Sequence, residues 1–158
     1  MEKETKKPRR PRMKTLFIET LKKMGCPYQK GNDKNEILVK YQGEKFVMCF
    51  YTELPYVRIW DLGWKAVLLE DLDEVARMRR AINKVNGCGC ATAYYSIDKE
   101  CGYMDVHAKS TILFIPEIPN LEKYLTIELN DFFHLHDEIN KVMNELRLED
   151  REKGRSLS

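Results

Sequence analysis

The sequence predicts an α+β fold, in which helices pack on one face of an antiparallel sheet of about five strands. Apolar and polar residues alternate along several short segments, whereas apolar residues recur at three- and four-residue steps along three longer ones. The expected order is helix, three strands, helix, two strands, helix. A chain of 158 residues with 43% hydrophobic and 33% charged residues has the composition of one folded domain.

Three segments have the apolar spacing of amphipathic helices. The first covers residues 14–24 and ends before Gly25, which suits a left-handed C-cap. The second begins at Asp71, where Glu74 completes a capping box, and its apolar residues are Leu72, Val75, Met78, Ile82 and Val85. The third covers residues 120–146 and carries a heptad stripe: Leu125, Leu129, Phe132, His136, Ile139, Met143 and Leu146. This stripe fits a coiled-coil seam or, more commonly at this length, the face that packs on the domain's own sheet.

The clearest strands form a predicted β-hairpin around Gln42-Gly43, a two-residue loop in which glycine accepts a positive φ. The strands cover residues 37–41 and 44–51. If Tyr41 pairs with Glu44, the register gathers one apolar face, made of Ile37, Val39, Phe46, Met48 and Phe50. Alternation and turn chemistry therefore support the same pairing.

Three further strands are expected. One covers residues 56–60 and ends at a turn formed by Asp61-Leu62-Gly63. The other two cover residues 90–97 and 102–115 and flank a turn at 98–101. The last strand has one buried face, made of Met104, Val106, Ala108, Ile112 and Phe114.

Charge divides the chain into an arm, a body and a tail. The first 14 residues hold seven basic and two acidic residues, a net +5, and the other 144 hold 20 basic and 23 acidic residues, a net −3. We predict a disordered basic arm over residues 1–13, a single domain over 14–148 and a flexible charged tail over 149–158. The arm's basic residues are candidates for nucleic-acid contact or simply a solubilising tail: Lys6, Lys7, Arg9, Arg10 and Arg12.

Apolar segments and cysteines indicate the cellular compartment that we expect for this protein. No apolar segment approaches the roughly 20 residues needed to span a bilayer, and the chain begins without the apolar segment of a secretory signal. The cysteines form an odd set with no evident disulfide framework: Cys26, Cys49, Cys88, Cys90 and Cys101. We therefore expect free thiols and a cytoplasmic protein.

The order of elements over residues 14–146 resembles the type III secretion chaperone-like fold, which is also found in the YbjN-like family of bacterial proteins. The resemblance rests on this layout and on no signature motif. It implies an antiparallel sheet with helices on one face, dimerisation in many members and, in secretion chaperones, binding of an extended client segment. It implies no catalytic residue, and the basic arm lies outside it.

Cysteine and histidine residues supply the candidates for a zinc site or a nucleophile, namely Cys88, Cys90, Cys101 and His107. The spacing Cys88-Gly-Cys90 does not match the usual zinc knuckle. If Cys90 lies opposite Lys109, then Cys101 is eight residues from that position, about 27 Å at about 3.4 Å per residue. Glycine-rich phosphate loops and the common hydrolase motifs are also absent from the sequence. We therefore expect no metal, no cofactor and no catalytic residue.

The sheet face opposite the helices is the best candidate for a functional surface. Alternation directs five aromatic and basic side chains to it: Tyr51, Arg58, Trp60, Tyr94 and Tyr103. Exposed aromatic residues beside arginine are typical of protein–protein interfaces, unless the chain's own loops cover them. The sequence thus favours a non-enzymatic, chaperone- or adaptor-like domain that binds another polypeptide or a second copy of itself. The alternative is a nucleic-acid-associated protein that uses the basic arm.

Deleting residues 1–12 is expected to leave the thermal unfolding midpoint nearly unchanged, because this segment has almost no apolar side chains to add to a core. Thermal scanning of the full-length and truncated proteins measures this directly. A large fall in the midpoint would show that the arm packs on the domain. Any polyanion binding by the arm should disappear with it and should weaken steeply with salt.

Overall fold

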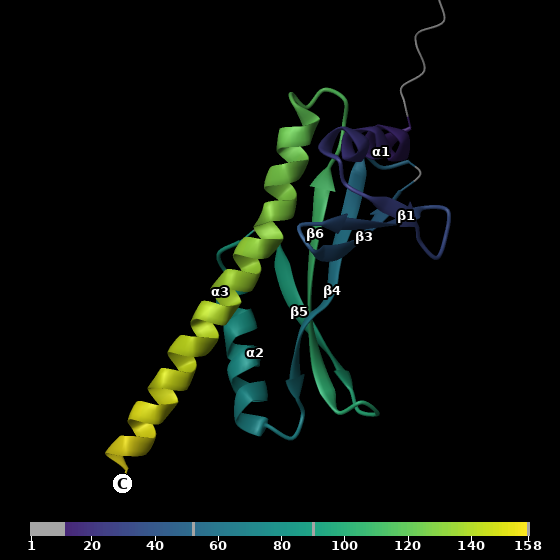
Figure 1. The fold of residues 1–158 in the computed structure, drawn as a ribbon. Helices are drawn as coiled ribbons and strands as arrows, with labels where there is room; N and C mark the ends of the chain where they lie inside the picture. The colour runs from purple at the N-terminus through teal and green to yellow at the C-terminus, as the bar shows by residue number, and fades with distance from the viewer. Residues whose placement is uncertain (1–11, 52, 90, 158) are drawn as a thin grey trace, which may run out of the picture.

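The structure, a computed structural model, describes residues 12–51, 53–89 and 91–157. It contains a six-stranded antiparallel sheet in the order β1-β2-β3-β4-β6-β5, with three helices on one face (Figure 1). Along the chain the elements are α1 (Met13–Met24), β1 (Tyr28–Lys30), β2 (Glu36–Tyr41), β3 (Glu44–Phe50), β4 (Tyr56–Leu68), α2 (Leu72–Asn86), β5 (Thr92–Asp98), β6 (Tyr103–Leu113) and α3 (Leu121–Ser156). The predicted α+β class is confirmed, with one strand more than expected.

The first hairpin forms as its sequence predicts. β2 and β3 pair with Tyr41 opposite Glu44, and both loop residues have positive φ, 47° at Gln42 and 87° at Gly43. Positive φ at both positions is the type I′ turn, whose twist matches that of the flanking strands. The added strand is β1, which pairs with β2. It was missed because its three residues are all exposed and show no alternation.

β4 is much longer than the predicted strand, and the expected turn at Asp61-Leu62-Gly63 is a β-bulge. The pairing with β6 shifts between Asp61 and Lys65, so that three residues of β4 lie opposite His107 alone. Gly63 has φ 65°, which glycine adopts without a steric penalty. A turn and a bulge share this sequence signal, and only the pairing with β6 distinguishes them.

The second hairpin pairs two residues away from the expected register. The sequence predicted Cys90 opposite Lys109, whereas Thr92 is the residue that pairs with Lys109 between β5 and β6. The loop between these strands is closed by a hydrogen bond from the Gly102 N–H to the Asp98 carbonyl (2.9 Å). This closure moves the turn one residue along the chain, which shifts the sum of partner numbers by two.

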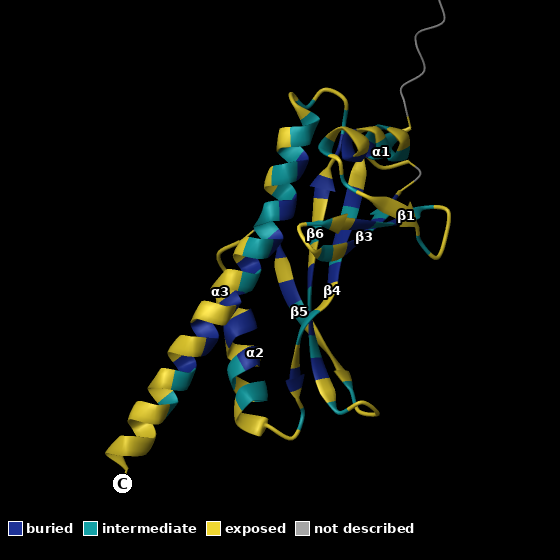
Figure 2. Cartoon of the chain, viewed as in Figure 1, coloured by how far each residue is buried: buried dark blue, intermediate teal, exposed yellow. Residues whose placement is uncertain are grey.

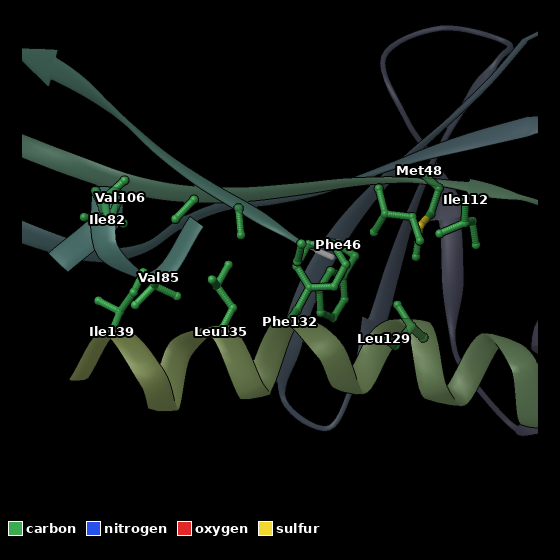
Figure 3. Close-up of a cluster of buried hydrophobic side chains, with 14 of the residues drawn as sticks. Phe46, Met48, Ile82, Val85, Val106, Ile112, Leu129, Phe132, Leu135 and Ile139 are labelled. Carbon is green, nitrogen blue, oxygen red and sulfur yellow. The ribbon is translucent and has the colours of Figure 1, made fainter. Parts of the chain in front are cut away.

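The core lies between the sheet and the helices. The ring of Phe17 in α1 lies 5.3 Å from Phe50 and 4.8 Å from Phe114, and Phe46 of β3 meets Phe132 of α3 edge-on at 5.2 Å. Apolar side chains of α2 and α3 point at the sheet (Figure 3). The heptad stripe of α3 therefore packs on the domain's own sheet, and the buried positions follow one side of this helix (Figure 2).

α3 ends at Ser156, well beyond the last apolar residue of the stripe at Leu146. Three ion pairs hold its later turns against α2: Arg147–Glu74 (2.8 Å), Arg77–Asp150 (2.7 Å) and Lys84–Glu145 (3.7 Å). Hydrogen bonds from the guanidinium group of Arg147 on α3 lower the pKa of Glu74, and Arg77 on α2 adds to this effect. The predicted flexible tail over 149–158 is thus wrong up to Ser156, where the chain is helical.

Truncating Ile59 to alanine is expected to lower the free energy of unfolding by about 2–5 kcal/mol, because Ile59 is fully buried and the change leaves a cavity. Trp60→Ala, at the next position of β4, is the matched control and should cost much less, because Trp60 is only partly buried. Urea denaturation of both variants measures the difference. If Trp60→Ala is as destabilising as Ile59→Ala, then Trp60 belongs to the core and the assignment of faces is wrong.

Candidate functional site

The sheet face opposite the helices, here called the open face, presents its side chains in rows across the strands. The pairings place one row along Leu38, Val47, Trp60, Lys109 and Thr92, and the adjacent row along Glu36, Cys49, Arg58 and Thr111. Buried core residues such as Ile59 and Met48 point the other way. Strand alternation thus separates a packed face from a face on which polar, basic and aromatic groups meet.

Cations and aromatic rings alternate along the middle of the open face. The guanidinium carbon of Arg58 lies 5.6 Å from the ring centre of Tyr51 and 5.9 Å from that of Trp60. The ammonium nitrogen of Lys109 lies 5.8 Å from Trp60 and 5.6 Å from Tyr94. Trp60 and Tyr94 also meet edge-to-face at 6.0 Å. These distances lie in the cation–π range, and we call the five residues the cation–aromatic ladder.

Four of the five residues predicted for this surface are members of the ladder: Tyr51, Arg58, Trp60 and Tyr94. The fifth, Tyr103, is exposed on the same face, at the far end of β6, and makes no contact with the ladder. Sequence reasoning missed Lys109, because a lysine in a strand has the pattern of an ordinary solvated residue. Only the register, with Lys109 opposite Trp60, reveals its place between two rings.

The two cations of the ladder are not neutralised by carboxylates within the part of the chain that the structure describes. Neither Arg58 nor Lys109 forms an ion pair there, and the one hydrogen bond from the Arg58 side chain goes to the Thr111 hydroxyl (3.4 Å). Three aromatic rings hold the cations in place while leaving their charge unpaired. Such a surface can accept carboxylates and offer apolar contact at the same time.

His107 lies at the end of the ladder and holds the β4 bulge. The Gly63 N–H donates to Nδ1 of His107 (2.8 Å), so that Nε2 carries the proton and donates to the Ser96 hydroxyl (2.7 Å). The ring of Tyr94 lies 4.9 Å from the imidazole. Burial lowers the pKa of His107, an effect opposed by the charges of Asp105 and Asp61. Both nitrogens are engaged, so His107 is not placed to bind zinc or to activate a cysteine.

The helix side of the same bulge contains a second histidine contact. Asp61 is 1% exposed, and its carboxylate approaches Nε2 of His136 to 2.7 Å. The two atoms are close, but their geometry lacks the alignment of a hydrogen bond. The indole of Trp64 stacks on the imidazole, with ring centres 4.0 Å apart and planes inclined by 19°. His136 is the one polar residue of the heptad stripe, and its contact with the buried carboxylate of Asp61 accounts for a polar residue at that position.

The cysteine and metal hypotheses find no geometric support in the described ranges. Cys90 lies outside them, and the other cysteines are free: Cys26, Cys49, Cys88 and Cys101. Within residues 12–51, 53–89 and 91–157, the acidic, cysteine and histidine side chains form no group of three that could hold a metal ion. The same ranges contain no helix with an apolar stretch long enough to traverse a bilayer.

The basic arm meets the folded body near the ladder. Lys6, Lys7, Arg9 and Arg10 lie outside the described residues, whereas Arg12 is exposed just before α1. A hollow of about 880 Å³ is lined by Arg12, Lys14 and Lys34, with one acidic residue, Glu53, and reaches Tyr51, the first ring of the ladder. The Lys14 ammonium donates a hydrogen bond to the Lys34 carbonyl, which joins α1 to the loop before β2. Three basic side chains therefore connect the root of the arm with the open face.

Comparison with known proteins supports the fold alone. Family models and curated protein sequences show no match to this chain. Among solved structures, the crystal structure of YbjN from E. coli, described as a proposed transcription regulator, is similar with a TM-score of 0.51. The match covers 89% of this chain and 94% of that chain at 8% sequence identity. This likeness supports the YbjN-like fold expected from the order of elements.

Stability is expected to fall as the pH is lowered below about 6.5, the ordinary histidine value, because His107 has a lowered pKa in the folded state. Between the two pKa values the unfolded chain binds a proton that the folded chain does not, so acid favours unfolding. The stabilising contribution is complete above the unfolded value and is lost as the pH falls through the folded one. Urea denaturation at pH 7.5, 6.5 and 5.5 measures the slope.

Two matched variants test whether His107 causes this dependence of the free energy of unfolding on pH. His107→Asn keeps an acceptor for the Gly63 N–H at every pH and should flatten the dependence. His134→Asn removes an exposed histidine on α3 and should leave it unchanged. An equal slope in wild type and His107→Asn would contradict the assignment.

Proposed function

We propose that this protein is a non-enzymatic, adaptor-like domain whose open face binds an acidic segment of another polypeptide. The observation that carries the proposal is the cation–aromatic ladder, in which Arg58 and Lys109 lie between rings without an ion-pair partner among the described residues. Partner carboxylates would pair with these two cations. Tyr51, Trp60 and Tyr94 would supply the aromatic contact that commonly anchors protein interfaces.

We propose a non-enzymatic role because the two histidines of the bulge region, His107 and His136, already have structural contacts. His107 is bound at both ring nitrogens, and His136 contacts Asp61 beneath Trp64. Each of these groups has a structural partner that accounts for it. The odd set of cysteines, with no evident disulfide framework in the sequence, supports a cytoplasmic location for this proposed adaptor. An adaptor role is compatible with the description of YbjN as a proposed transcription regulator.

A second candidate function is binding of single-stranded nucleic acid. It is favoured by the basic path from Arg12, Lys14 and Lys34 to Tyr51, because such strands bind to cationic grooves with aromatic stacking platforms. Two features make it the weaker candidate. The rings of the ladder already contact cations, and the chain after residue 14 carries a net −3.

Reversing both ladder charges, Arg58→Glu with Lys109→Glu, is expected to weaken binding of an acidic aromatic peptide at least about tenfold, which corresponds to about 1.4 kcal/mol. The probe is a labelled peptide of repeated Asp-Asp-Phe, and the readout is fluorescence anisotropy. The matched control is Lys40→Glu with Lys45→Glu, a cross-strand pair that makes no ladder contact. Equal losses in the two double variants would refute the ladder as the binding site.

Two further measurements separate the alternatives. If a labelled oligo(dT) binds more tightly than the peptide and loses binding on deletion of residues 1–12, the nucleic-acid candidate replaces the proposal. Sedimentation of wild type and Trp60→Ala tests self-association. A dimer that Trp60→Ala dissociates would identify the open face as an interface between two copies of this chain.

A further inference from the structure

β5 is an edge strand with a free side. Among the described residues it pairs with β6 alone, at the end of the sheet opposite β1. β1 has three residues, whereas β5 has seven, Thr92–Asp98, and so offers a much longer edge. α2 lies beside this edge on the helix side of the sheet (Figure 1). An unpaired edge of this length can accept another strand unless the protein blocks it.

Asn86 identifies which backbone groups face the free edge. Its Oδ1 accepts the Ala93 N–H (2.8 Å) and its Nδ2 donates to the Ala93 carbonyl (2.8 Å). These are the two hydrogen bonds that a residue of a neighbouring antiparallel strand would exchange with Ala93. Backbone direction alternates along a strand, so the N–H and C=O groups of Tyr95 and Ile97 point to the same edge.

The rest of the edge lacks the features that usually prevent strand addition. The described part of β5 contains no proline, no lysine and no bulge. Tyr95 and Ile97 are 37% and 45% exposed, although their partners on β6 are buried core residues. The edge after Ala93 therefore presents free backbone groups beside accessible apolar side chains.

Two arginines lie beside the middle of this edge. An open groove of about 610 Å³ separates α2 from β5 and is lined by Arg79, Arg80, Ile82, Asn83, Asn86 and Tyr95. Arg79 and Arg80 are exposed, and neither forms an ion pair within the described ranges; Arg80 acts on Asp150 of α3 only at longer range. A strand added to β5 would direct every second side chain towards this groove, where acidic side chains would meet two guanidinium groups.

A second copy of the chain fits this edge poorly. Pairing β5 with itself about a two-fold axis would bring two α2 helices together near their midpoints. Arg79 and Arg80 lie at the middle of α2, Leu72–Asn86, so four guanidinium groups would converge. Such like charges oppose association. Charge complementarity therefore favours an acidic partner over a symmetric dimer at this edge.

We propose that the free edge of β5 binds an extended acidic segment of a partner protein as a seventh strand, antiparallel to β5. The segment exchanges backbone hydrogen bonds with Tyr95 and Ile97, and its acidic side chains face Arg79 and Arg80. Asn86 occupies the position beside Ala93 and thereby sets one end of the added strand. This site shares no residue with the cation–aromatic ladder, so it stands independently of the function proposed above.

The first test uses a labelled ten-residue peptide of alternating glutamate and valine, with fluorescence anisotropy as the readout. Arg79→Glu with Arg80→Glu is expected to weaken its binding at least about tenfold. Lys22→Glu with Lys23→Glu, an exposed pair on α1, is the matched control and should change it less than about twofold. Arg58→Glu with Lys109→Glu should also leave it unchanged, which separates this site from the ladder.

The second test examines strand pairing itself. In an antiparallel pair, residues that exchange hydrogen bonds have side chains on the same face. N-methylation of the glutamates, which face the groove, should therefore abolish binding, whereas N-methylation of the valines should be tolerated. Ile97→Pro removes an N–H that points to the free edge and keeps the pairing with β6, so it should weaken binding while the domain stays folded.

Three results would overturn the proposal. Equal binding of the two N-methylated peptides would show that the segment does not add as a strand. Equal binding of a lysine–valine peptide would remove the role of Arg79 and Arg80. A dimer of the protein alone that Ile97→Pro dissociates would assign the edge to a second copy of the chain.

Discussion

The bulge in β4 is the constraint on which the two faces of this sheet depend. Its inserted residues leave the alternation in phase, so Ile59 before it and Val67 after it both point into the core. The bulge also requires polar contacts on each side of the sheet. On the open face, the Gly63 N–H of the bulge donates a hydrogen bond to His107. On the helix side, Asp61 contacts His136. Because β4 continues through the bulge to Leu68, it delivers the chain directly to α2.

Charge is distributed unevenly over this domain, with most of the ion pairs among the described residues lying between two helices. Glu74, Asp150 and Glu145 pair with basic residues between α2 and α3, and these contacts hold the long helix in place. The cations of the ladder and the two arginines beside β5 have no such partners among the described residues. A nearly neutral protein therefore presents two separate basic surfaces. One combines charge with aromatic rings, and the other combines it with a free backbone edge.

The likeness to YbjN is a likeness of fold at 8% sequence identity. Many different sequences can satisfy the packing requirements of one fold. Likeness of fold does not establish a binding surface, and the one proposed above depends on individual side chains such as Trp60 and Lys109. The function must accordingly be argued from these side chains and not from the architecture.

The sequence by itself determined the fold class, the starts of the first two helices to within one residue, the register of the first hairpin and the outward direction of Trp60. These features follow from local preferences: caps, turn residues and alternation act over a few positions. Only the tertiary structure decided the bulge, the place of Lys109 between two rings, the pairing of Asn86 with Ala93 and the helical end of α3. Most of these join residues far apart in the chain, such as Arg77 and Asp150, and even Asn86 reaches Ala93 only once α2 packs beside β5. Their energies arise from partners that no local pattern specifies.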